Sequence, residues 1–170
     1  MKLTYFQIDA FTDKIFSGNP AGVCPLDEWL ANDVMQKIAL ENNLSETAFF
    51  VPKEDSYQLR WFTPTKEVDL CGHATLASAW VIFNQLNSAL EEIQFSTRSG
   101  ILTVHRQKQK LVMDFPASNL ISVKTPKTLI EGLGIIPIES FFSVDYTQSV
   151  WDLGVRALHF LRMTRRDDAT

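Results

Sequence analysis

Residues 70–90 contain no aspartate, glutamate, lysine or arginine, and this stretch limits the fold more than any other part of the chain. Its first half is also rich in small residues, namely Gly72, Ala74, Thr75, Ala77, Ser78 and Ala79. A helix of this composition has no face suited to water, so the stretch predicts a helix over 72–86 that is buried on all sides. Polar residues such as His73 and Asn84 interrupt the stretch, which argues against a membrane span.

The start of this helix carries reactive side chains. Cys71, Gly72 and His73 lie at its first turn, where unpaired backbone amides favour a carboxylate or another anion. A buried helix that directs its positive end, a thiol and an imidazole to one place is a suitable beginning for an active site. Asp69, Cys71 and His73 alternate along the chain, and alternate side chains point the same way only on a strand. These three residues fall at a strand-to-helix junction, so a metal site formed by them is disfavoured.

The composition favours a globular protein. The chain has 170 residues, of which 45% are hydrophobic, enough for one ordinary domain or two small ones. Its net charge of -4 argues against an electrostatic nucleic-acid binder. The two cysteines are too few for a disulfide framework, and the first residues lack the apolar core of a signal peptide. We therefore expect a cytoplasmic protein that binds neither nucleic acid nor membranes.

The residues before the buried helix predict strands and one surface helix. Residues 3–10 are β-prone, 17–22 form a loop with two glycines, and Val23–Cys24 begin the next strand. An amphipathic helix is predicted over 28–42, with Asp27 as its cap. Further strands are predicted at 47–51 and 57–62, joined as a hairpin, and near 92–96, 101–105 and 111–115.

These elements predict an α+β lobe over residues 1–117, in which a curled, barrel-like mixed or antiparallel sheet surrounds the central helix. Residues 118–170 are predicted to be a linker and an incomplete second lobe. Its predicted parts are a polar linker at 118–126, a short helix at 126–132, a strand at 138–146, helical content at 150–163 and a fraying tail at 164–170.

Five motifs in the first lobe carry a family resemblance. They are, in chain order, SGNPAGV (17–23), LSETAF (44–49), RWFTP (60–64), LCGHATLA (70–77) and DFPA (114–117). Together they resemble the phenazine-biosynthesis isomerase family (PhzF-like), which shares the diaminopimelate-epimerase fold. The resemblance implies two similar lobes, each a barrel-like sheet around a helix, with the substrate held in the cleft between them.

The resemblance also implies roles for individual residues. Glu46 corresponds to the general acid/base of the family, and His73 to a histidine that orients substrate or assists proton transfer. Gly72, Asn19 and Ser45 correspond to positions in contact with substrate. From the residues alone, Glu46 precedes an apolar run and is expected to be partly desolvated, which suits proton transfer. The alternative is an ordinary solvated glutamate at a strand end.

Cys71 has two interpretations. A thiol at a helix N-terminus is often acidic and reactive, and in related amino-acid epimerases a cysteine in this position belongs to a pair of thiols. Here the second cysteine, Cys24, lies in the same lobe, so a buried structural role for Cys71 is favoured. His73 is expected to be neutral, because a helix N-terminus disfavours an imidazolium ion.

The resulting hypothesis is an isomerase without cofactor or metal, in which Glu46 moves a proton on a small carboxylate-bearing metabolite. The alternatives are a cysteine-dependent amino-acid epimerase or racemase, and a truncated lobe that acts only by association. A single open lobe exposes apolar surface, so a homodimer is expected. We also expect weak or no activity from this chain alone, because half a cleft places its substrate poorly.

Overall fold

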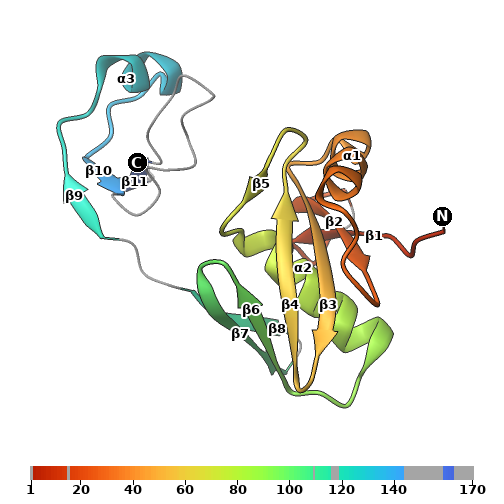
Figure 1. Cartoon of the computed structure of the whole chain (residues 1–170). Coiled ribbons are helices and arrows are strands. Elements are labelled where there is room, and N and C mark those ends of the chain that lie inside the picture. Colours follow the sequence, from red (N-terminus) through yellow and green to blue (C-terminus); the bar gives the residue numbers. More distant parts are fainter. Residues whose placement is uncertain (1, 15, 109, 116–118, 144–158, 163–170) are drawn as a thin grey trace. The chain divides into compact units, whose positions relative to one another are not determined.

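The computed structural model describes residues 2–14, 16–108, 110–115, 119–143 and 159–162. The chain divides into two compact units, Met1–Phe115 and Pro116–Thr170 (Figure 1). Elements of the first unit are, in order, β1 (Phe6–Ala10), β2 (Asn19–Pro25), α1 (Asn32–Asn42), β3 (Glu46–Lys53), β4 (Ser56–Phe62), β5 (Glu67–Val68), α2 (Gly72–Val81), the π-helical turn η1 (Ile82–Leu86), β6 (Glu92–Thr97), β7 (Gly100–Gln107) and β8 (Lys110–Asp114).

The first unit is one mixed sheet curled around α2. Seven strands follow the order β1-β2-β3-β4-β6-β7-β8, and β5 pairs with β4. The β2–β3 and β4–β6 pairs are parallel, whereas the others are antiparallel. Helix α2 contacts β1, β2 and β3 and also β8, which lies at the opposite end of the order. A helix can touch both edges of a sheet only if the sheet curls around it, as predicted.

The small residues of α2 let the sheet approach closely. Ala74 and Val81 are 0% exposed and Ala77 is 1% exposed, which confirms the central helix. Two polar side chains are tolerated inside it because each hydroxyl donates to the carbonyl four residues earlier, Thr75 to Cys71 and Ser78 to Ala74. The prediction of burial on every side over 72–86 was wrong at Trp80, which is 39% exposed, and at residues 84–86, where Leu86 is 51% exposed. No helix in the described residues is long and apolar enough to cross a membrane.

The part of the sheet that contains β3 is covered on both faces, which explains the unbroken apolar run in that strand. Ala48 and Phe50 belong to the core around α2, whereas Phe49 and Val51 belong to a second core beneath α1. Successive side chains of a strand point to opposite faces, so a strand covered on both sides needs apolar residues at every position. Glu46 is the first residue of β3 and precedes this apolar run.

Helix α1 begins later than predicted. It starts at Asn32 after Ala31, and neither Asp27 nor any other side chain caps it. The preceding segment is held in a non-helical path because the Trp29 indole donates to Gln58 of β4 over 2.9 Å. The predicted end is confirmed, since Asn43 adopts the left-handed conformation that closes α1.

The predicted loop at 17–22 was also partly wrong, because Asn19–Gly22 are already part of β2. These residues pair with β1 on one side and β3 on the other. Gly22 makes this possible, since a side chain there would meet the Thr47 hydroxyl at 2.9 Å. Strand β5 was not predicted. The other predicted strands and the β3–β4 hairpin are confirmed.

The second unit holds a small antiparallel sheet in the order β11-β10-β9 and one short helix. Its elements are β9 (Leu120–Ser122), α3 (Lys127–Leu133), β10 (Glu139–Ser143) and β11 (His159–Arg162). The helix and β10 were predicted, but β9 lies within the segment 118–126 that was predicted to be a linker. The helical content predicted for 150–163 is wrong at His159–Arg162, and its remainder and the tail at 164–170 lie outside the described residues.

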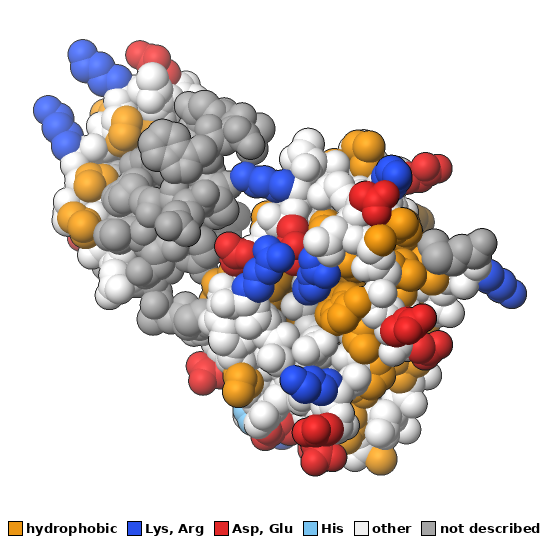
Figure 2. Space-filling model, in the orientation of Figure 1, with side chains coloured by type: hydrophobic (Ala, Val, Ile, Leu, Met, Phe, Trp, Pro, Cys, Tyr) orange, Lys and Arg blue, Asp and Glu red, His pale blue; other side chains and the backbone are white. Residues whose placement is uncertain are grey.

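Charge on the first unit is mixed in sign. Figure 2 shows acidic and basic side chains interspersed over its visible face.

Two exposed aromatic side chains, Phe11 and Phe16, precede β2 and are 72% and 98% exposed. They contrast with Phe83 of η1, which is fully buried in the core around α2.

This contrast gives a matched test of the core. Phe83→Ala should lower the free energy of unfolding by about 3–5 kcal/mol, because it removes a ring from a closed core. Phe16→Ala makes the same chemical change at an exposed position and should alter it by no more than about 0.5 kcal/mol. Urea unfolding followed by tryptophan fluorescence measures both. Equal losses in the two variants would contradict the placement of η1.

Candidate active site

Three chain segments meet at the beginning of α2. Glu46 opens β3, and its neighbour in the sheet is Ala21 of β2. His73 is the second residue of α2, and the backbone of Pro20 in β2 lies near enough to raise the pKa of its imidazole, through the carbonyl because proline has no backbone N–H. The parallel β2–β3 pair and the helix start therefore bring residues near positions 20, 46 and 73 together.

Both ring nitrogens of His73 have side-chain neighbours. Its Nε2 lies 3.3 Å from Oε2 of Glu46 and 3.4 Å from Oγ of Ser45, and its Nδ1 lies 3.4 Å from Sγ of Cys71. The site is mostly closed to water, since the side chains of His73 and Glu46 are only 10% and 20% exposed. An imidazole held on both sides has a fixed orientation, and the carboxylate beside it is partly desolvated, as predicted.

The surroundings of His73 favour its neutral form. Burial lowers the pKa of the imidazole, and this effect exceeds the opposing influence of the Glu46 carboxylate and of the Pro20 carbonyl. The direction agrees with the neutral histidine expected at a helix N-terminus. A neutral imidazole can donate one hydrogen bond and accept another, but it contributes no positive charge.

Comparison with known proteins identifies the family of this chain. Residues 8–138 match the family described as phenazine biosynthesis-like protein, PhzC-PhzF. The chain belongs to the PhzC-PhzF family. This confirms the resemblance drawn from the five motifs, and the relatives and solved structures below agree with it.

A Pseudomonas aeruginosa protein named as an uncharacterized isomerase is 55% identical over 152 residues, which cover 89% of this chain and 59% of that protein. A solved Enterococcus faecalis structure, described as a phenazine biosynthesis protein of the PhzF family, is 45% identical with a TM-score of 0.77. The match covers 84% of this chain and 55% of that one. The chain thus spans little more than half the length of these relatives.

The predicted diaminopimelate-epimerase-like fold is confirmed as well. A structure described as a predicted epimerase of Pseudomonas aeruginosa superposes with a TM-score of 0.64, over 83% of this chain and 56% of that one. At 19% identity, this likeness concerns the fold alone. PhzC-PhzF proteins and epimerases therefore share the half-barrel sheet with its central helix.

Cys71 is a protonated thiol in this PhzC-PhzF site. Burial and then the nearby Glu46 carboxylate raise the pKa of its thiol to about 12, and they outweigh the backbone amides of His73 and Ala74. Cys24 lies in the other core, beneath α1, where burial raises its thiol pKa to about 12 as well. The two thiols are therefore on opposite faces of the sheet, and neither favours the reactive thiolate that an epimerase pair requires.

Glu46, Cys71 and His73 also form a group of potential metal ligands, with donor atoms within 4.8 Å of one another. A metal would have to displace the proton of a thiol whose pKa is about 12, which disfavours binding near neutral pH. The absence of a metal stays a prediction. Asp69 lies apart from this group and instead forms an ion pair with Arg98 at 3.4 Å.

The predicted substrate-contacting residues, Ser45, Gly72 and Asn19, differ in how near they lie to His73. Ser45 contacts His73, and Gly72 is next to it in α2. Asn19 opens β2, where it pairs with Ala10 of β1. A pocket of about 240 Å³ contains none of these residues and is lined by Trp29, Gln58, Leu59, Arg60, Ser96, Thr97 and Arg98.

Sequence reasoning missed three neighbours of the site. The Pro20 carbonyl contacts His73, and the side chains of Met113 and Phe115 lie about where a side chain on Gly72 would reach, at 3.6 and 3.7 Å. Pro20 and Phe115 both belong to motifs that carried the resemblance. Their position in those motifs was the available signal, since neither carries a titratable group.

The His73–Glu46 contact gives a titration test. Glu46→Gln removes the carboxylate that raises the pKa of His73, so the pKa should fall further below its ordinary value. Nuclear magnetic resonance of the His73 ring over a pH series measures it. Glu92→Gln alters a carboxylate that pairs with His105 instead and serves as the control. An unchanged or higher His73 pKa in Glu46→Gln would show that the two groups are not neighbours.

Proposed function

We propose that this chain carries the acid/base group of an isomerase acting on a small, unsaturated carboxylate. The observation that supports it most is the 3.3 Å contact between Glu46 and the neutral His73 at the N-terminus of a buried helix. Membership of the PhzC-PhzF family and relatives named as isomerases agree with it. The substrate class and the role of Glu46 are our inference.

In the proposed reaction, the Glu46 carboxylate takes a proton from carbon, and the electron pair of that bond moves along the conjugated system. The same carboxyl group then returns the proton to a different carbon. No electrons are gained or lost overall, so the step needs no redox cofactor. The backbone amides of Gly72 and His73, at the positive end of α2, would stabilise the negative charge that develops on the substrate.

A single acid/base group separates this proposal from the enzymatic alternative. Inversion at one carbon needs two groups on opposite faces of the substrate, and here the second thiol lies in the other core. The protonated state of Cys71 also favours Glu46 as the base. Cys71 is then a hydrogen-bonding neighbour that helps hold the His73 ring.

We further propose that this chain acts slowly on its own and associates as a homodimer. Correct placement of reacting groups can account for about 7–11 kcal/mol of a barrier, and one lobe surrounds a substrate incompletely. The relatives it matches are nearly twice as long as the matched segment. Exposed aromatic side chains such as Phe16 are consistent with association.

Hydrogen exchange in D₂O tests the function more directly than turnover does. Incubation with dihydroaromatic and other unsaturated carboxylates should place deuterium on substrate carbon, as seen by proton nuclear magnetic resonance, and the exchange should survive EDTA. Glu46→Gln should slow it at least about 10²-fold, the lower end of a general acid/base contribution. Cys71→Ala should have a much milder effect, and Glu54→Gln, in an exposed turn, should have none. Loss of exchange in Cys71→Ala with retention in Glu46→Gln would replace this proposal by the epimerase alternative.

Gly72 offers a second test, because a side chain there has room. An added Cβ would lie 3.6 Å from the nearest atom of Met113, an ordinary contact, so Gly72→Ala should unfold with unchanged or slightly higher free energy. If substrate approaches this backbone, the same methyl group should still slow exchange, with the main effect on KM. Unaltered exchange in a stable Gly72→Ala variant would place the substrate elsewhere.

A further inference from the structure

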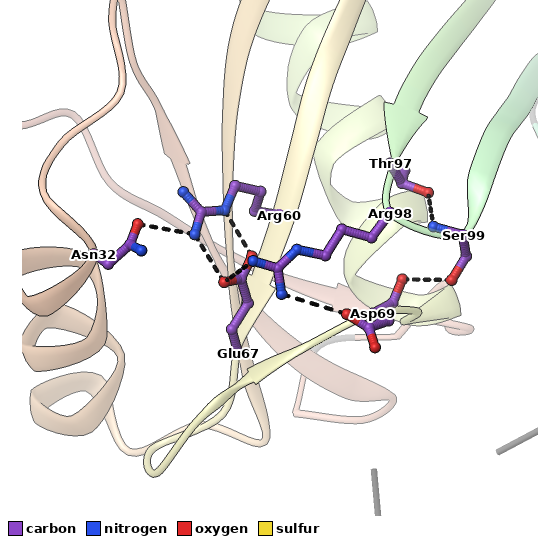
Figure 3. Close-up of polar contacts among 7 residues, drawn as sticks. All are labelled: Asn32, Arg60, Glu67, Asp69, Thr97, Arg98 and Ser99. Carbon is purple, nitrogen blue, oxygen red and sulfur yellow. Dashed lines mark hydrogen bonds and ion pairs between the residues drawn. The ribbon is translucent and has the colours of Figure 1, made fainter. Parts of the chain in front are cut away.

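A cluster of charged side chains holds the chain immediately before the active-site helix. Glu67 of β5 accepts two hydrogen bonds from Arg60 of β4, at 2.6 Å from Nε and 2.8 Å from Nη2. The Arg98 guanidinium lies 2.7 Å from the same carboxylate. Figure 3 shows the two guanidinium groups converging on Glu67, one from strand β4 and the other from the turn between β6 and β7. Paired hydrogen bonds of this kind fix direction as well as distance.

The central pair of this cluster is shielded from water. The side chains of Glu67 and Arg60 are 14% and 19% exposed, whereas Arg98 is 55% exposed. An exposed ion pair contributes little, but a mostly buried carboxylate that accepts two hydrogen bonds and pairs with a second guanidinium is costly to disturb. Arg60 extends the cluster further, since its Nη2 also donates to Asn32 at the start of α1 over 3.0 Å.

A second attachment follows two residues later. The Ser99 hydroxyl donates to the backbone carbonyl of Asp69 over 2.9 Å, and Arg98 pairs with the Asp69 carboxylate. The turn that presents Ser99 is itself held by Thr97, whose hydroxyl accepts from the Ser99 amide and donates to the Gly100 carbonyl (Figure 3). Residue 67 is thus fixed to strand β4 and to the β6–β7 turn, and residue 69 is fixed to that turn.

These attachments add direction to the entry to α2, which is otherwise held by the packing of Val68, Leu70 and Cys71 against the core. Strand β5 has two residues and pairs only with β4, at Trp61↔Val68 and Phe62↔Glu67. Cys71, the residue before α2, makes no side-chain capping hydrogen bond. The segment 67–71 leads directly into Gly72 and His73, so its position sets where the imidazole meets Glu46.

We propose that Glu67, held by Arg60 and Arg98, is a positioning residue that places the first turn of α2 against Glu46. A catalytic role for this positioning rests on the proposed function. The position of His73 relative to Glu46 can be tested without any measurement of activity. Glu67 touches no reacting group. It acts through the path of the chain from β5 to His73.

The test uses the His73 ring as a reporter. The Glu46 carboxylate raises the pKa of His73, so movement of His73 away from it should lower that pKa. Glu67→Gln should therefore lower the His73 pKa, as Glu46→Gln does. The double variant should fall no further than Glu46→Gln alone, because both changes remove the same interaction.

Glu67→Asp separates positioning from a direct effect of charge. It keeps the negative charge but draws the carboxylate back by one methylene, so the two hydrogen bonds from Arg60 and the ion pair with Arg98 cannot all form. The proposal predicts a lower His73 pKa in Glu67→Asp also. A fall in Glu67→Gln together with no change in Glu67→Asp would show a field effect and overturn it, as would no change in either. Glu54→Gln is the control for an exposed carboxylate.

Ser99→Ala gives a milder second variant should Glu67 substitutions prevent folding. It removes only the bond to the Asp69 carbonyl and should lower the His73 pKa by a smaller amount. In the exchange assay, Glu67→Gln should lower kcat roughly 10-fold or more with little change in KM, since misplacement of reacting groups costs rate. Lower pKa values without detectable exchange in the unaltered chain would support the positioning role and overturn the proposed function.

Discussion

The burial of α2 inside a curled sheet is the constraint on which the rest of this structure depends. A helix without a charged face can be accommodated only if the sheet covers it, and contacts with β1 at one end and β8 at the other show that it does. The inner polar groups are satisfied by the helix itself, through the hydroxyls of Thr75 and Ser78. With its sides fixed in this way, the start of α2 has a defined place against the first residues of β2 and β3.

Burial also sets the protonation of the groups gathered there. It lowers the pKa of His73 and raises that of Cys71, so both are held in their uncharged forms. Of the three side chains in this cluster, Glu46 is therefore the one to which we assign the proton transfer in the proposed reaction. The roles that we propose for Glu46 and Cys71 follow from this desolvation, because a thiol held in its protonated form is not suited to act as a base.

The sequence allowed the central helix and most strands to be predicted, because a charge-free stretch and an apolar run have one physical explanation each. Glu46 and His73 were paired only through the family resemblance, since no spacing rule links them, and their roles stay predictions. The late start of α1 could not be foreseen, because the Trp29–Gln58 hydrogen bond that delays it joins distant parts of the chain. Glu67 and Arg60 likewise read as ordinary strand charges until β5 brought them together.

The charged side chains around α2 fall into two groups, one that holds the chain before the helix and one, Glu46, that lies beside His73. The charged groups that fix the entry to α2 lie before it, at Glu67, Asp69 and Arg98, while the helix itself carries none. Glu46 is the one charged group that shifts the pKa of both Cys71 and His73. The effect of a single carboxylate on the pKa of His73 depends strongly on the distance between the two groups. The cluster around Glu67, by setting the position of His73, therefore also sets the electrostatics of the site.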